Sequence, residues 1–217
     1  MLAEPEWKTL PWFEISKTPK DTLVDVYVEI PGLFETSDKI REDSEEHSRG
    51  KLIDHFVSRC WQIRYELKRW YTTTGSGIES LIGRIMAKGD RTASVEHMAS
   101  AQLLVLYWCC ILHYSQLRQE VFESENLDMQ VQIPAAEEDA QTTCGNILRV
   151  MVLFLNPCSG WFGINIAALP MVAVFNHIQG LRPLGATCKE KDILCKLLQT
   201  PKGKVLSGFV QSMRRVT

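Results

Sequence analysis

The spacing of apolar and polar positions is helical over most of this chain. From Leu52 to Tyr71 apolar residues recur at intervals of three and four, while lysine, arginine and aspartate occupy the opposite side. Residues 78–87 repeat the pattern in a shorter form. Alternation of the kind that marks a strand nowhere extends over more than a few residues. The pattern therefore predicts an all-α fold.

Two segments are apolar on nearly every side, which is typical of helices at the centre of a soluble protein. One is Leu103–Leu112, inside a helix expected over about residues 94–122. The other is Ile164–Ile178, which must accommodate Pro170 by kinking or by beginning its regular part there. The longest apolar-dominated runs, Leu103–Leu112 and Trp161–Phe175, are interpreted as buried core and fall short of the roughly 18 to 20 residues that a helical membrane span needs. We therefore expect no membrane partner.

The opening of the chain is interpreted as extended, because prolines stand at positions 5 and 11. A helix is expected from Asp21, although its β-branched residues also permit a strand. Pro31-Gly32 is expected to stop this element, and the acid-rich stretch Glu35–Arg49 is interpreted as an exposed helix turn or loop.

Further helices are expected over 137–155, 189–198 and 205–213. The sequence thus predicts a single irregular multi-helix bundle of about seven or eight helices. No shift in composition and no long linker divides the chain, so we expect one domain over residues 1–217.

Composition adds little to this picture. The chain has 217 residues, of which 45% are hydrophobic and 23% charged, as in ordinary folded proteins. The net charge of -2 offers no overall field that would attract nucleic acid. Residues 182–217 carry eight Lys or Arg against two Asp or Glu, a net of +6. Lysines spaced in this way are most often a solvated helix face.

Seven cysteines without a Cys-x-x-Cys pair indicate a reducing compartment, where they pack as small apolar groups. Cys109 and His113 share a helix face but do not supply the three or four ligands of a metal site. We expect no metal and no cofactor. Acids and prolines between Met1 and Trp12 indicate that there is no signal peptide, so an intracellular location is expected.

Polar side chains within the apolar segments are the main candidates for chemistry. They are His113, Asn165, Asn176 and His177, each expected to be buried and to cost about 1 to 3 kcal/mol without a partner. They could converge on a pocket for a small molecule, or bond helix termini or one another, and the spacing leaves both open. The sequence has no nucleophile elbow and no phosphate-binding glycine loop.

A series of separated pieces resembles the regulatory region of fungal zinc binuclear cluster transcription factors, over roughly Trp7 to Val210. The pieces are Leu23–Leu33, Cys60-Trp61 with Trp70-Tyr71, Leu103–Tyr114, Cys144–Arg149, Phe154–Pro157, Gly160–Gly163, Ala168–Pro170 and Leu181–Pro183. The resemblance implies a helical fold. That family's DNA-binding module carries six cysteines beginning Cys-x-x-Cys, and this chain has nothing of the kind. We expect no sequence-specific DNA binding by this chain alone.

The resemblance implies a regulatory domain in the nucleus or cytoplasm, connected with fungal secondary metabolism. Its expected partners are proteins of the transcription machinery or a DNA-binding partner, with a small hydrophobic ligand as a further candidate. The alternative is a helical enzyme of the isomerase or cyclase type, in which His113, His177 and Asn165 supply acid, base or hydrogen-bond donor. A decayed fragment without an independent role is a third possibility.

Overall fold

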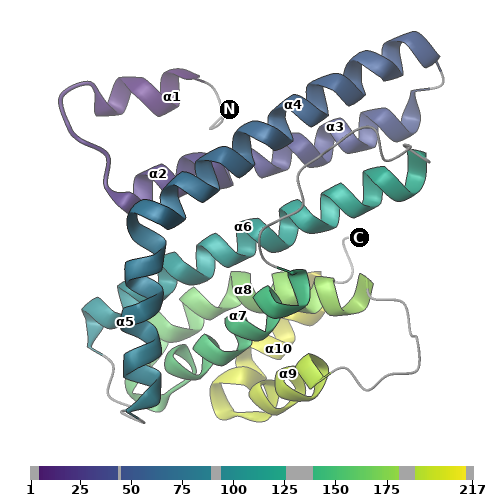
Figure 1. Ribbon diagram of the computed structural model, residues 1–217. Coiled ribbons are helices and arrows are strands. Elements are labelled where there is room, and N and C mark those ends of the chain that lie inside the picture. Colours follow the sequence, from purple (N-terminus) through teal and green to yellow (C-terminus); the bar gives the residue numbers. More distant parts are fainter. Residues whose placement is uncertain (1–4, 44, 89–93, 126–138, 181–188, 214–217) are drawn as a thin grey trace. The chain divides into compact units, whose positions relative to one another are not determined.

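The structure is a computed structural model that describes residues 5–43, 45–88, 94–125, 139–180 and 189–213 (Figure 1). All regular secondary structure in these ranges is helical, which confirms the all-α class. Ten α-helices and three shorter segments of 3-10 or π geometry occur there, more than the seven or eight helices expected. The predicted bundle arrangement stays a prediction.

The helices and their bounds are as follows. The first part of the chain contains α1 (Pro5–Thr9), η1 (Leu10–Trp12), α2 (Pro19–Tyr27), α3 (Ile30–Glu42), α4 (Glu46–Trp70) and η2 (Tyr71–Gly75). The remainder contains α5 (Ser76–Ala87), α6 (Val95–Glu125), α7 (Ala140–Phe154), η3 (Pro157–Ser159), α8 (Gly160–Gly180), α9 (Lys189–Gln199) and α10 (Pro201–Met213).

The contacts of the chain divide it into two compact units. The first unit is Met1–Ser76 with His113–Glu137, and the second is Gly77–Leu112 with Glu138–Thr217. One boundary falls at the first residue of α5 and another in the middle of α6. The boundary inside α6 leaves no glycine, proline or linker signal in the sequence. The expected single domain over residues 1–217 stays a prediction.

In the first unit, α2 and α3 pack against α4. The Thr18 hydroxyl accepts a hydrogen bond from Asp21 N, and the Asp21 carboxylate accepts one from Thr18 N, so the two residues form a capping box that starts α2. Pro31 lies in the first turn of α3. The expected stop at Pro31-Gly32 is therefore wrong, because proline is compatible with the first turn of a helix, where its missing N–H has no intrahelical partner. Of the helix turn or loop expected over Glu35–Arg49, the structure has helix up to Glu42 and again from Glu46.

The opening segment is also corrected by the structure. Residues 5–12 are helical, as α1 and η1, where an extended segment was expected. Pro5 begins α1 and Pro11 lies within the short η1, so neither proline interrupts a helix of several turns.

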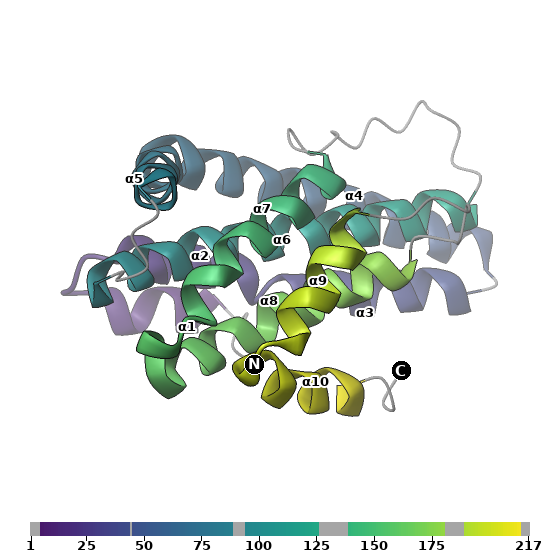
Figure 2. The same cartoon turned by 90° about the horizontal axis from the view of Figure 1, so that it is seen from below.

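In the second unit, α8 packs against α7 on one side and against α10 on another, and α9 packs against α7 and α10 (Figure 2). Two glycines allow close approach of backbone to backbone. A Cβ at Gly163 would overlap the carbonyl oxygen of Phe154, and a Cβ at Gly203 would overlap that of Leu197. The helix α8 continues through Pro170.

The two segments that were expected to be buried, Leu103–Leu112 and Ile164–Ile178, differ in how much of their surface is exposed. Tyr107 and Trp108 are buried, as expected for the centre of α6. The first half of α8 instead leaves several large side chains in solvent, which bears on the functional site below.

Candidate functional site

The three residues proposed for catalysis are divided between the two units. His113 lies on the part of α6 that belongs to the first unit, while Asn165 and His177 lie on α8 in the second. On α8 the two residues are twelve positions apart, which is about 18 Å along a helix. No arrangement of acid, base and donor follows from their placement within either unit.

His113 is largely buried and packs its ring against Phe34 of α3. The two ring centroids are 6.2 Å apart and the planes meet at 77°, an edge-to-face contact. Burial lowers the pKa of His113 below 6.5, because the charged imidazolium is disfavoured away from water. The geometry is that of a packed neutral imidazole.

This burial predicts a pH dependence of stability. The unfolded chain protonates its imidazole near pKa 6.5, whereas the lowered pKa of folded His113 lies below that value. Above about pH 6.5 the imidazole is mostly neutral in both states, and the free energy of unfolding is at its full value. As the pH falls from about 6.5 towards the lowered pKa of folded His113, the unfolded chain binds the proton more readily and the free energy of unfolding decreases. His113→Phe keeps the aromatic contact and removes the titration, so urea unfolding between about pH 7.5 and about pH 5.5 should show a smaller loss of stability than in the wild type. Equal losses in both proteins would contradict this account.

His177 lies near the C-terminal end of α8, and its Nε2 is buried without a hydrogen-bond partner. Burial lowers its pKa, while Asp139 at the N-cap of α7 and Glu190 in the first turn of α9 act in the opposite direction. Glu190 also accepts a hydrogen bond of 3.4 Å from the side-chain amide of Gln141. The imidazole thus lies within the field of carboxylates from two other helices of its unit.

Asn165 and Asn176 are exposed, so the expectation that they are buried is wrong. Because α8 is apolar on nearly every side, its sequence does not identify which side faces α7 and α10. The two amides point away from the packed side and need no partner from the protein interior.

The cysteines for which the structure describes a state are free thiols. Burial raises the pKa of Cys60 to about 12 and raises the pKa values of Cys109 and Cys110 well above the usual range. Such thiols are poor nucleophiles and poor metal ligands. Among the described residues there is no group of three or more His, Cys, Asp or Glu placed to hold a metal ion.

An open hollow on the surface lies at the beginning of α4. It is lined by Glu45, His47, Gly50, Lys51 and Asp54. None of the three proposed catalytic residues takes part in it. It contains exposed charged groups from one helix and its N-cap, without the apolar lining that small-molecule sites usually have.

The exposed apolar side chains on the first half of α8 form the clearest candidate for a functional surface. Trp161 is 73% exposed, Phe162 48% and Leu169 40%. We call these three residues the α8 apolar surface. Leu169 stands eight positions after Trp161 and seven after Phe162. At 3.6 residues per turn, all three therefore lie on one side of the helix, with Leu169 about two turns from the aromatic residues along its axis. This surface was not expected from the sequence, because the whole apolar segment was interpreted as core.

Two stretches in the described part of the chain are long and apolar enough to cross a membrane, Val95–Gln119 and Pro157–Gln179. Their mean hydropathies are 1.4 and 1.6, and 56% and 39% of their apolar windows are buried. The helices are longer than the apolar runs counted from the sequence. Core helices of soluble proteins meet the same criterion, and the expected absence of a membrane partner stays a prediction.

Comparisons with known proteins give no relatives for this chain. No protein-family model, no curated protein and no solved structure matches it.

Proposed function

We propose that this chain is a helical regulatory domain of transcription control that acts through protein contacts and has no DNA-binding module of its own. The proposal rests on the serial resemblance to the fungal regulatory region, on the all-α class and on the α8 apolar surface. Its partners are proteins of the transcription machinery or a separate DNA-binding protein. Nucleus or cytoplasm is the corresponding location.

The observation that carries the proposal is the exposure of Trp161 and Phe162, with Leu169 exposed about two helical turns further along α8. Aromatic side chains are enriched in protein interfaces, where a few of them supply most of the binding energy. The helix that bears them packs against α7 and α10, so its exposed side is held on a fixed framework within the second unit. A partner would gain the burial of these three side chains without ordering a flexible loop.

The enzyme alternative has no comparable support. His113 and His177 belong to different units, and Asn165 is exposed on α8. General acid and base groups must lie within hydrogen-bond reach of one substrate, and within the second unit Asn165 and His177 are twelve positions apart on α8.

A reporter assay tests the proposal. The full chain is fused to a heterologous DNA-binding module, and the fusion should change transcription of a reporter that carries the matching operator. The double variant Trp161→Ser, Phe162→Ser should reduce that change by about tenfold or more, because the loss of two interface aromatics typically costs at least about 2 kcal/mol. The matched control is Trp61→Ser, Tyr65→Ser, which removes two exposed aromatics from α4.

Two results would contradict the proposal. A wild-type fusion that leaves the reporter unchanged, together with unchanged transcripts in a deletion strain, would exclude a regulatory role. A pathway intermediate that accumulates in the deletion strain would favour the enzyme.

A further inference from the structure

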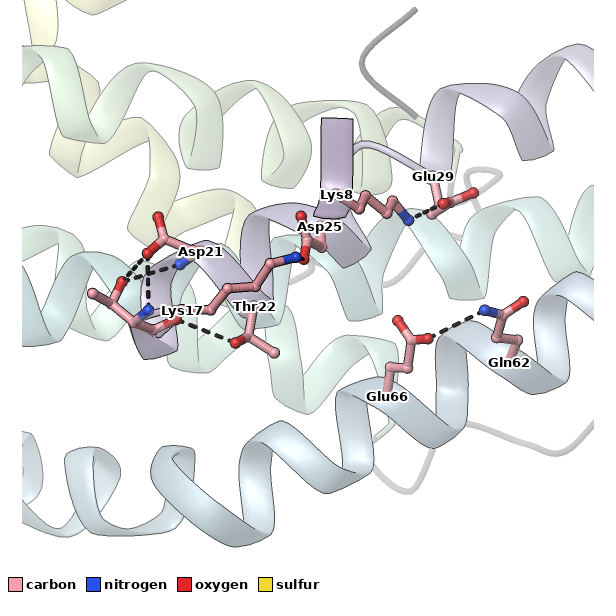
Figure 3. Close-up of polar contacts among 9 residues, drawn as sticks. Lys8, Lys17, Asp21, Thr22, Asp25, Glu29, Gln62 and Glu66 are labelled. Carbon is pink, nitrogen blue, oxygen red and sulfur yellow. Dashed lines mark hydrogen bonds and ion pairs between the residues drawn. The ribbon is translucent and has the colours of Figure 1, made fainter. Parts of the chain in front are cut away.

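The segment that precedes α2 is attached to the first unit by its lysines. Lys8 Nζ forms an ion pair with Glu29 Oε1, between α2 and α3, and Lys17 Nζ forms one with Asp25 Oδ2 on α2 (Figure 3). These pairs join residues 21 and 8 positions apart in the chain. They hold the segment at two points, one on α2 and one at the start of α3.

Glu29 is the centre of this attachment. Its carboxylate also forms an ion pair with Arg59 of α4 through Oε2, and its side chain is only 11% exposed. One carboxylate therefore holds a cation from the opening segment and a cation from the long helix of the unit. Glu66, one helical turn beyond Gln62 on α4, accepts a hydrogen bond of 3.2 Å from that glutamine (Figure 3).

The charged groups around Lys8 have opposite effects on its pKa. Burial lowers the pKa of Lys8, while Glu66 and Asp25 act to raise it and Arg59 and Lys17 act to lower it. The ammonium group thus loses hydration where it binds, and carboxylates offset part of that loss.

Most of the large apolar side chains described in the segment are not buried. Leu10, Phe13 and Ile15 are exposed, and Trp12 is partly buried. The Lys17 ammonium lies 5.8 Å from the centre of the Trp12 ring, which is a contact within the segment itself. A helix of five residues such as α1 is too short to be stable alone. The attachment therefore depends on the ion pairs and is sensitive to salt.

We propose that residues 8–17 are a strap that reversibly covers the acidic face formed by Asp25, Glu29 and Glu66, and that its release opens this face to a lysine-bearing segment of another protein. While the strap is bound, Lys8 and Lys17 occupy the carboxylates that a basic partner would need. The strap is an autoinhibitory contact within the first unit. It is independent of the function proposed above, which concerns α8.

Limited proteolysis of the full chain tests whether the strap detaches. Chymotrypsin cleaves after exposed aromatic residues, and Phe13 lies in the middle of the strap. The double variant Lys8→Ala, Lys17→Ala should be cleaved there about five to ten times faster than the wild type, because two weak ion pairs are lost. The control Lys20→Ala, Lys51→Ala removes the same charge from exposed positions of α2 and α4 and should be cleaved at the wild-type rate.

Salt and a peptide provide two further measurements. Raising sodium chloride from about 0.05 M to about 0.5 M should accelerate cleavage of the wild type but not of the Lys8→Ala, Lys17→Ala variant. A labelled peptide of residues 5–17 should bind that variant at least about fivefold more tightly than the wild type in fluorescence anisotropy, because the variant's own strap competes less.

The outcomes separate clearly. Equal cleavage rates in the wild type, the strap variant and both salt concentrations would overturn the proposal, as would equal peptide binding. Far-UV circular dichroism of each variant confirms that α2 and α4 are intact, so faster cleavage is not caused by unfolding of the unit. Glu29→Gln provides an independent variant from the other side of the contact. It should also accelerate cleavage at Phe13, by less than the strap variant because the Lys17–Asp25 pair remains, and it should not strengthen peptide binding because the partner of Lys8 is lost.

Discussion

Gly203→Ala should destabilise the protein by about 3 kcal/mol, the upper range for overpacking of a tight contact. The new Cβ would overlap the carbonyl oxygen of Leu197 and would lie 2.8 Å from Leu198 Cα. Both are backbone atoms at the end of α9 and cannot move aside as a flexible side chain can. Relief therefore requires α10 to separate from α9, which are otherwise in contact.

The same helix supplies the control for this prediction. Gly208 has open space where a Cβ would be added, and Gly208→Ala should stabilise the protein by up to about 1 kcal/mol through helix propensity. Urea unfolding followed by circular dichroism measures both changes. If Gly203→Ala proves neutral while Gly208→Ala is stabilising, the close approach of α9 and α10 is not present in solution.

Trp70→Ala should cost about 3 to 5 kcal/mol, the range for removing a large aromatic side chain from a core. Trp70 is 2% exposed, and its Nε1 donates a hydrogen bond of 2.7 Å to the carbonyl oxygen of Pro19 at the start of α2. The change removes this link between α4 and α2 as well as the buried ring. Trp70→Phe should cost less, because it retains an aromatic ring and loses mainly the hydrogen bond.

Trp61 is the matched control on the same helix, since its side chain is 49% exposed. Trp61→Ala should change the free energy of unfolding by no more than about 0.5 kcal/mol. Both free energies come from urea titrations under identical conditions. Similar losses for Trp61→Ala and Trp70→Ala would show that the assignment of the buried side of α4 is wrong.

The long helices of this fold are predictable from the sequence because their periodicity is local information. The bounds of α4 (Glu46–Trp70) and α6 (Val95–Glu125) agree with those of the expected helices to within a few residues, except at the start of α4. The errors occur at prolines. Pro31 was expected to end a helix, although it lies in the first turn of α3. Pro5 and Pro11 were expected to keep the opening segment extended, although both lie in short helices.

The candidate site could not be predicted to the same extent. Where a helix is apolar on every side, as α8 is, the sequence does not say which side remains in solvent, so Trp161 was taken as core and Asn165 as buried. Ion pairs such as Lys8 with Glu29 join residues far apart in the chain, and no spacing rule identifies them. Both features depend on tertiary packing.

The distribution of the thiols offers a means of following the two units separately. Cys60 belongs to the first unit, whereas Cys109, Cys110 and Cys144 belong to the second, and all four are buried. Cys158 and Cys195 are exposed. An alkylating reagent would therefore mark the exposed pair at once and each buried thiol only when its surroundings open. Mass spectrometry of the modified peptides over time would then report how often each unit opens locally, without any added label.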